Sequence, residues 1–238
     1  MSEAIWHDLE CGGYVEDLSF WRQLAAKTGG PVLDVGAGTG RVTLELARAG
    51  LSVMAVDLDD GLLEVLRERA GDLDVRTVVG DARAFWVGEG FALCVVPMQT
   101  IQLLGGPDGR ESFLECARSL LEPGAVMAVA LAEELDCFET VEGAPGPLPD
   151  VTEIDGIVYS SRPVAVRPEG DGFTLERRRE TVTADGRLSI ERNLIHLDGL
   201  DAETLEDEAT AAGLRPIDRV SIAATDDYVG TTVVMFRG

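Results

Sequence analysis

Short apolar runs alternate with amphipathic stretches through the first half of the chain. Five apolar runs have the length of buried strands: 32–35, 52–56, 75–79, 91–97 and 125–131. Four stretches show helical spacing of their apolar residues: 16–28, 41–49, 60–70 and 108–121. Nearly uniform apolar strands that alternate with helices are typical of parallel sheets covered on both faces. The pattern therefore predicts an α/β fold with a doubly wound and mostly parallel sheet, which becomes seven-stranded when the last two strands of the chain, 214–222 and 228–236, are added.

The pattern changes after residue 132. Residues 142–150 are rich in Pro and Gly, which predicts a connector. Three longer runs with strand-like alternation follow, and Asp185-Gly186 separates the last two as a hairpin turn: 157–167, 172–183 and 187–198. A helix over 201–212 and two strands over 214–222 and 228–236 complete the chain. We expect an antiparallel β insert after the fifth strand and a terminal hairpin that rejoins the sheet.

Three parts follow from these elements. Residues 1–30 are expected to form an N-terminal helical cap. Residues 31–135 and 199–238 are expected to form the ligand-binding core. Residues 150–198 are the antiparallel insert, which we expect to serve as an acceptor lid or a dimer surface.

Charge and cysteine usage narrow the function further. The 238 residues carry a net charge of −23, which opposes binding to a phosphate backbone, so we expect no nucleic-acid partner. The four cysteines show neither paired spacing nor a cluster with histidine, so we expect no metal site. The sequence shows no apolar run of membrane-spanning length. We expect a cytoplasmic protein with reduced thiols, without membrane partners, as a monomer or homodimer.

A glycine-rich turn carries the strongest functional signal. Gly36, Gly38 and Gly40 follow the first strand, which contains Asp34, and the helix over 41–49 follows them. A strand, a glycine turn and a helix N-terminus form a nucleotide-type pocket. For a dinucleotide the third glycine comes one residue early, but the turn alone leaves both a dinucleotide and another nucleoside cofactor open.

Asp57 ends the second strand, 21 residues after Gly36, where an acidic side chain accepts hydrogen bonds from ribose hydroxyls. The alternative is a helix N-cap, a role that Asp59 or Asp60 fills better. Asp57 therefore indicates a ribose, and it fits a dinucleotide or another nucleoside cofactor equally.

Taken together, these residues resemble the motifs of class I S-adenosylmethionine-dependent methyltransferases of the small-molecule type. The first motif is Asp34 with the glycine turn, and Asp81-Ala82 after the third strand matches the segment that recognises adenine in that family. Leu121-Glu122-Pro123-Gly124 is similar to the family's turn before the fifth strand. The resemblance covers residues 30–131, and the terminal hairpin more loosely. Ala92 and Gln99 depart from the acid and the asparagine that many members have near these places.

The resemblance implies S-adenosyl-L-methionine as the cofactor. It implies that Leu58 packs on the adenine and that the Tyr14 hydroxyl lies near the cofactor carboxylate. Arg41 either meets the same carboxylate or faces solvent. The implied cofactor-binding residues are Tyr14, Asp34, Gly36, Ala37, Gly38, Gly40, Asp57, Leu58, Asp81, Ala82, Pro97 and Met98.

The predicted activity is methyl transfer to a nitrogen or oxygen of a small-molecule acceptor. Candidate acceptor contacts are Gln99, Tyr159, Arg162 and Arg179. The catalytic residue stays unassigned, with His7 and His196 as candidates for a general base. A non-catalytic S-adenosylmethionine-binding module for regulation or assembly is the alternative. An NAD-dependent oxidoreductase is a third, which the short glycine spacing and Asp81-Ala82 disfavour.

Overall fold

The computed structural model describes residues 2–141 and 146–238, and these residues form two compact units. Residues 14–133 and 200–238 form the larger one, called the core unit below. Residues 1–13 and 134–199 form the other, called the insert unit. Residues 1–30, predicted to form one cap, are thus divided between the two units. Residues 142–145 of the predicted connector lie outside the described residues.

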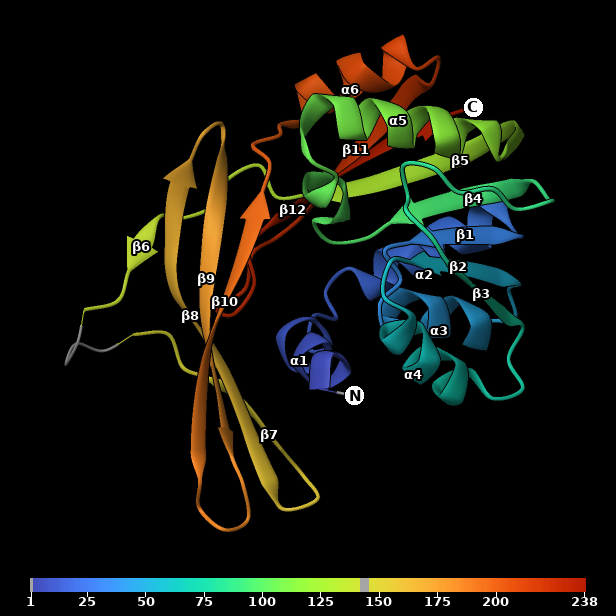
Figure 1. The fold of residues 1–238 in the computed structure, drawn as a ribbon. Coiled ribbons are helices and arrows are strands. Elements are labelled where there is room, and N and C mark those ends of the chain that lie inside the picture. The colour runs from blue at the N-terminus through green and yellow to red at the C-terminus, as the bar shows by residue number, and fades with distance from the viewer. Residues whose placement is uncertain (1, 142–145) are drawn as a thin grey trace. The chain divides into compact units, whose positions relative to one another are not determined.

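A seven-stranded sheet lies at the centre of the core unit, in the order β11-β12-β5-β4-β1-β2-β3 (Figure 1). Its strands are β1 (Val32–Val35), β2 (Val53–Asp57), β3 (Val75–Val79), β4 (Phe91–Val96), β5 (Leu121–Leu131), β11 (Arg215–Ile222) and β12 (Thr231–Arg237). The strands from β1 to β5 pair in parallel, whereas β12 runs antiparallel to both β5 and β11. This topology confirms the predicted fold, including the antiparallel strand that the terminal hairpin contributes.

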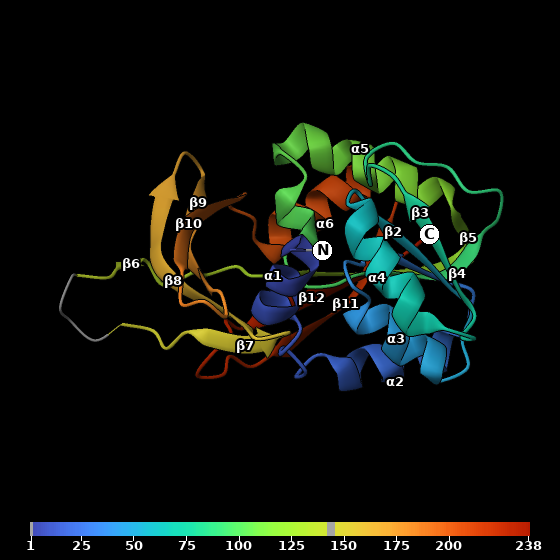
Figure 2. The ribbon, with the colours of Figure 1, turned by 60° about the horizontal axis from the view of Figure 1, so that its bottom comes forward.

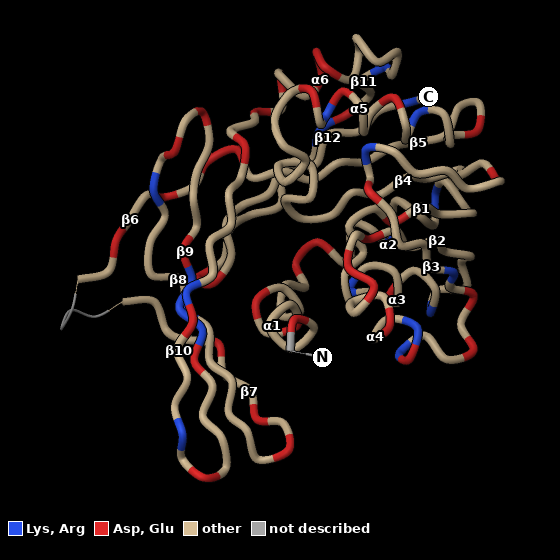
Figure 3. The backbone as a smooth tube through the Cα atoms, viewed as in Figure 1, with Lys and Arg blue, Asp and Glu red and all other residues tan. Residues whose placement is uncertain are grey.

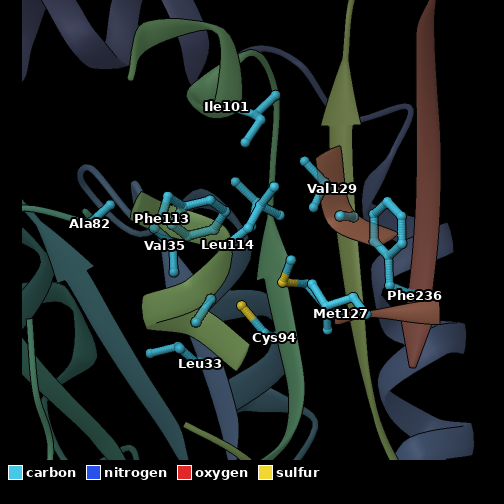
Figure 4. Packing of buried hydrophobic residues seen from close by; sticks show 14 of the residues in the cluster. Leu33, Val35, Ala82, Cys94, Ile101, Phe113, Leu114, Met127, Val129 and Phe236 are labelled. Carbon is cyan, nitrogen blue, oxygen red and sulfur yellow. The ribbon is translucent and has the colours of Figure 1, made fainter. Parts of the chain in front are cut away.

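Helices cover both faces of this sheet because successive strand residues point to opposite sides. The helices are α2 (Leu18–Thr28), α3 (Arg41–Arg48), α4 (Asp60–Ala70), the short 3₁₀ helix η1 (Thr100–Leu103), α5 (Gly106–Ser119) and α6 (Ala202–Ala211). Leu33 and Val35 belong to one buried cluster with residues of α5 and α6, whereas Val32 belongs to another with residues of α2 and α3. Figure 2 shows α5 and α6 on one side of this sheet and α2 and α3 on the other. Figure 4 shows Phe113 and Leu114 of α5 beside Val35. A buried core on each face holds the strand ends in fixed positions.

The insert unit is an antiparallel sheet in the order β10-β9-β8-β6, with β7 also paired to β8 (Figure 1). Its elements are α1 (Ser2–Cys11), β6 (Phe138–Glu139), β7 (Asp150–Ile154), β8 (Ile157–Glu169), β9 (Gly172–Val182) and β10 (Leu188–Leu197). Three of these strands lie within two residues of the predicted bounds. The short strands β6 and β7 were not predicted.

One predicted turn lies inside a strand. Residues 122–124, expected as a tight turn, belong to β5, which begins at Leu121. The register between β4 and β5 shifts there, since Phe91 pairs with Leu121 and Leu93 with Val126. Gly124 has a φ of +82°. The Pro-Gly sequence therefore lies among the first residues of β5, at the shift in register, instead of preceding the strand.

Charged residues are spread unevenly along the chain. Figure 3 shows acidic positions throughout both units, while basic positions of the insert unit gather where β8, β9 and β10 run side by side. Among the described residues, the helices are too short or too polar to cross a lipid bilayer.

Candidate cofactor site

The glycine turn after β1 has a backbone that only glycine adopts readily. Gly36, Gly38 and Gly40 have φ values of +73°, +54° and +95°. A Cβ on Gly40 would lie 2.3 Å from Leu66 of α4, and one on Gly36 would lie 2.5 Å from the Thr100 side chain. The turn is thus held tightly between α4 and the segment that follows β4.

Asp34 lies beneath this turn and is fully buried. Its Oδ2 accepts a hydrogen bond of 2.6 Å from the Thr43 hydroxyl of α3, and Oδ1 has no polar partner among the described residues. Burial raises the pKa of Asp34 to about 6, although the Thr43 hydrogen bond acts in the opposite direction. With no exposed surface, Asp34 supports the turn from inside the core, which differs from the direct cofactor contact expected of it.

Asp57 connects the end of β2 to the glycine turn. Its Oδ2 accepts a hydrogen bond of 2.8 Å from the Gly38 N–H, and its Oδ1 accepts one of 3.0 Å from the Asp59 N–H. Asp59 caps α4, because its Oδ1 accepts from the N–H groups of Gly61 and Leu62. The cap role therefore belongs to Asp59, and the Asp57 carboxylate keeps acceptor capacity for a ligand.

The carboxyl ends of three neighbouring parallel strands bring the candidate residues to one edge of the sheet. The glycine turn follows β1, Asp57 is the last residue of β2 and precedes Leu58, and Asp81 comes after β3. Leu58 is 69% exposed although it is a large apolar residue. Ala82 is buried. An exposed apolar side chain beside two carboxylates is the kind of surface that receives a nucleoside.

Asp81 is held by the residue two positions later. The Arg83 side chain donates from Nη2 to Oδ2 at 2.6 Å and from Nε to Oδ1 at 2.9 Å, and the Arg83 N–H also donates to Oδ1. The side-chain hydrogen bond from Arg83 is the main cause that lowers the pKa of Asp81 to about 2. Asp81 is therefore a carboxylate of fixed orientation.

The segment after β4 makes a sharp turn beside the glycines. Met98 has a φ of +55°, in the left-handed region that side chains rarely adopt. The Thr100 hydroxyl donates to the Pro97 carbonyl at 3.0 Å, which places Thr100 against Gly36. Pro97 is buried, whereas Met98 and Gln99 are partly exposed. The turn therefore presents Met98 and Gln99 at the same edge of the sheet.

Tyr14 and Arg41 make contacts that differ from the expected ones. Tyr14 is 2% exposed, and its hydroxyl donates to the Thr231 hydroxyl at 3.4 Å. Arg41 pairs with the buried Asp17 and also donates to the Tyr14 carbonyl at 2.8 Å. Burial is the main reason that the pKa of Tyr14 is raised. Arg41 is thus neither a solvent-facing residue nor a free cation.

The candidate acceptor contacts of the insert unit are distributed over both faces of its sheet. Tyr159 packs edge-on against Trp6 of α1, with ring centroids 5.3 Å apart. Arg179 lies on the same face and pairs with Glu10 of α1 through two hydrogen bonds of 2.8 Å. Arg162 pairs in register with Arg178 and so lies on the opposite face. The structure therefore does not gather these three residues.

Both candidate bases also belong to the insert unit. His7 lies on α1, and His196 lies on β10 opposite Thr174. The His196 side chain is 49% exposed, and its ring nitrogens lie 3.9 Å from Glu169 and 4.0 Å from Asp198. Ile190 and Leu194, which alternate onto the same side of β10 as His196, are exposed apolar residues. Neither histidine shares a unit with the glycine turn.

Sequence reasoning missed the residues that hold the site. Asp17 was counted only as part of a helix, and Thr43, Arg83 and Thr100 were given no role. The role of Arg83 could have been predicted from the sequence, because an arginine two positions after a turn aspartate can form a bidentate ion pair with it. No group of metal-ligating side chains occurs among the described residues.

Residues 32–124 match the family described as a methyltransferase domain. The cypemycin N-terminal methyltransferase of Streptomyces sp is 32% identical over 130 residues, which cover 55% of this chain and 49% of the relative. The chain thus spans about half of the length of this curated relative.

Two solved structures show the same fold over nearly the whole chain. The CcbJ methyltransferase from Streptomyces caelestis has a TM-score of 0.71 at 24% identity and covers 95% of this chain and 91% of its own. CalS10, an amino pentose methyltransferase from Micromonospora echinaspora solved with S-adenosylmethionine bound, has a TM-score of 0.69 at 21% identity, with 100% and 96% covered. Residues 32–124 thus match a methyltransferase domain, and the described chain has the same fold as these two methyltransferases. The resemblance seen in the sequence is confirmed.

Proposed function

We propose that this protein is an S-adenosylmethionine-dependent methyltransferase that acts on a small molecule. The observation that carries the proposal is the edge of the core sheet where the glycine turn, Asp57 and Asp81 meet. The match of residues 32–124 to the methyltransferase domain supports it. So does the CalS10 structure, which binds the same methyl donor.

The residues at this edge fit S-adenosylmethionine. Asp57 would accept from the ribose hydroxyls, and its bond to the Gly38 N–H fixes that carboxylate against the turn. Leu58 would cover one face of the adenine, and Asp81 would accept from its amino group. The Cβ-free backbone of the turn would approach the methionine part, because Gly36 is exposed there. Pro97, Met98 and Gln99 would border the reacting side.

The cofactor supplies a sulfonium-bound methyl group, and the protein's task is to hold donor and acceptor in line. A neutral amine needs no general base, whereas a hydroxyl benefits from one. The core unit contains no histidine, since His7 and His196 both belong to the insert unit. This supports an amine nitrogen as the first acceptor to test and an oxygen as the second. The names of the cypemycin and CalS10 relatives, which act on a peptide N-terminus and an amino pentose, also support an amine.

A small acceptor is favoured over nucleic acid by charge. A net charge of −23 repels a phosphate backbone, and the acidic positions are spread over both units (Figure 3). The insert unit carries a basic group of side chains on β8 to β10, but most of these arginines are paired with carboxylates.

Calorimetric titration with S-adenosylhomocysteine tests the first half of this proposal. We expect saturable binding that Asp57→Ala weakens at least about ten-fold, because a hydrogen bond to a charged group is lost. Absence of binding up to millimolar concentration would contradict the proposal.

The second half is tested with labelled S-adenosylmethionine and a panel of amines and amino sugars. Transfer of label to an acceptor is the expected result. Tight binding without transfer to any panel member would instead indicate a cofactor-binding module for regulation or assembly, and binding of a nicotinamide dinucleotide would indicate an oxidoreductase.

A further inference from the structure

Besides a longer hydrogen bond of 3.4 Å to the Leu104 carbonyl, the Arg83 side chain directs its hydrogen bonds to the carboxylate of Asp81, its near neighbour in sequence. The two residues are separated by Ala82 only, and the pair lies in the exposed loop after β3. The side chains are 46% and 33% exposed, so the pair contributes little to stability. Another bidentate pair of the core unit, Arg219 with Glu206, joins β11 to α6 instead. The main effect of the Arg83 hydrogen bonds is therefore to hold the Asp81 carboxylate in one orientation.

The hydrogen bonds leave Asp81 with a defined remaining capacity. An ionised carboxylate offers about four lone-pair positions. Three N–H groups of Arg83 occupy about three of these positions. The backbone N–H and Nε donate to Oδ1, and Nη2 donates to Oδ2. Nε also lies 3.1 Å from Oδ2. About one position is left for a further donor.

The other end of the guanidinium contacts the loop before α5, which holds the Arg83 side chain in place. Arg83 Nη1 lies 3.4 Å from the Leu104 carbonyl, at the loop before α5. Gly109 of α5 lies against the Arg83 side chain, since a Cβ there would be 3.5 Å from Cδ. Arg83 is thus held at its backbone, at Asp81 and at this loop.

We propose that Arg83 is a positioning residue that orients Asp81 to accept one N–H from the exocyclic amine of adenine. This inference rests on the proposed function, because it assigns the adenine of S-adenosylmethionine to Asp81. Through this arrangement the protein discriminates a 6-aminopurine from a purine without that amine. Because Arg83 holds the pKa of Asp81 at about 2, the carboxylate is ionised and accepts hydrogen bonds near neutral pH.

The test compares S-adenosylhomocysteine with its analogue that lacks the 6-amino group, by calorimetry on the full chain. The measured quantity is the ratio of the two Kd values. For the unaltered protein we expect a preference of about ten-fold or more for the amine, as for a hydrogen bond to a charged acceptor. Asp81→Ala should bring the ratio close to one.

Arg83→Ala should lower the ratio to within about three-fold of one, because the carboxylate loses its orientation. Arg83→Lys should restore only part of it, since an ammonium cannot form the bidentate contact. Arg219→Ala is the matched control, with a side chain of the same 46% exposure, and should keep the original ratio. Unfolding curves of each variant show whether the fold is retained.

Two results would overturn the inference while the proposed function stands. One is tight binding of both ligands by the unaltered protein with a ratio near one. The other is an unchanged ratio in a folded Arg83→Ala variant. Failure of the unaltered protein to bind S-adenosylhomocysteine at all would instead contradict the proposed function itself.

Discussion

Arg41, the first residue of α3, forms a bidentate ion pair with Asp17, the residue before α2, at distances of 2.5 and 2.8 Å. The Asp17 side chain is buried, and its Oδ2 also accepts from the Trp21 indole at 2.7 Å. The pair fixes the start of the helix that follows the glycine turn. It also explains why Arg41 is not available to a cofactor carboxylate.

Removing Arg41 should therefore destabilise the core unit strongly. We expect Arg41→Ala to lower the free energy of unfolding by about 3–5 kcal/mol, because it leaves a buried carboxylate without its cation. Arg22→Ala is the control, since Arg22 pairs with Glu45 across the same two helices but is half exposed, and it should cost less than about 1 kcal/mol. Urea unfolding measures both, and equal losses would contradict the argument.

The close approach at Gly40 gives a second prediction. Gly40→Ala places a Cβ in Leu66 and keeps a strained φ, whereas Gly50→Ala keeps a similar φ of +90° with nothing within 4 Å. We expect Gly40→Ala to cost about 1–3 kcal/mol more than Gly50→Ala, from overpacking alone. Thermal unfolding of the two variants checks it. A difference near zero would mean that Leu66 moves aside without cost.

Two aspartates at the end of β2 should have opposite phenotypes. Asp59→Ala should lower the free energy of unfolding by about 1 kcal/mol, because the α4 cap is lost, and change S-adenosylhomocysteine affinity less than about three-fold. Asp57→Ala should lower that affinity at least about ten-fold. Calorimetry and urea unfolding on both variants separate the roles. Loss of affinity in Asp59→Ala with none in Asp57→Ala would reverse our assignment.

Asp34 should make stability fall as pH rises. Its pKa is about 6 in the folded protein and about 3.8 when unfolded, so the folded state binds more protons between these values. The contribution is fully favourable below pH 4 and is lost as pH rises through 6. Relative to Asp34→Asn, the unaltered protein should lose about 3 kcal/mol between pH 4 and pH 8. A pH-independent difference in urea unfolding would contradict this.

In the insert unit, Glu10 should control the order of α1. Its carboxylate accepts from Arg179 and from the Ser161 hydroxyl at 2.6 Å. Burial alone would raise the pKa of Glu10, but these hydrogen bonds and the nearby Arg177 lower it. Glu10→Ala should speed amide exchange in α1 by about ten-fold or more. Glu3→Ala, which removes an exposed partner 3.5 Å from Arg179, should leave exchange nearly unchanged.

Much of the core unit could be predicted from sequence because its strands and helices have strong, unmixed patterns. The run 75–79 and the helix 60–70 match the structure residue for residue. β6 is too short for a pattern, and β7 continues a stretch of prolines and glycines. The pattern of α1 mixes charged and aromatic residues on its packed side, because Glu3, Trp6 and Glu10 all contact Arg179 of β9.

The places of Asp57 and Asp81 at the ends of neighbouring strands could be predicted from the sequence. The adenine role of Asp81 came only from the family resemblance and stays a prediction. Contacts that depend on tertiary packing could not be predicted, such as Thr43 under Asp34 or Arg179 against Glu10. An arginine on a strand looks the same in sequence whether it meets a ligand or a carboxylate 169 residues away.

That separation has a consequence for how the chain is made. The helix α1 leaves the ribosome before its partners, because Ser161 and Arg179 come 151 and 169 residues later than Glu10. Synthesis at about 5–20 residues per second makes Glu10 wait on the order of ten seconds for them. During that time α1 lacks the strands β8 and β9, which carry the partners of Glu10. The two segments of the insert unit are therefore synthesised before and after most of the core unit, so the insert unit can fold only late in synthesis.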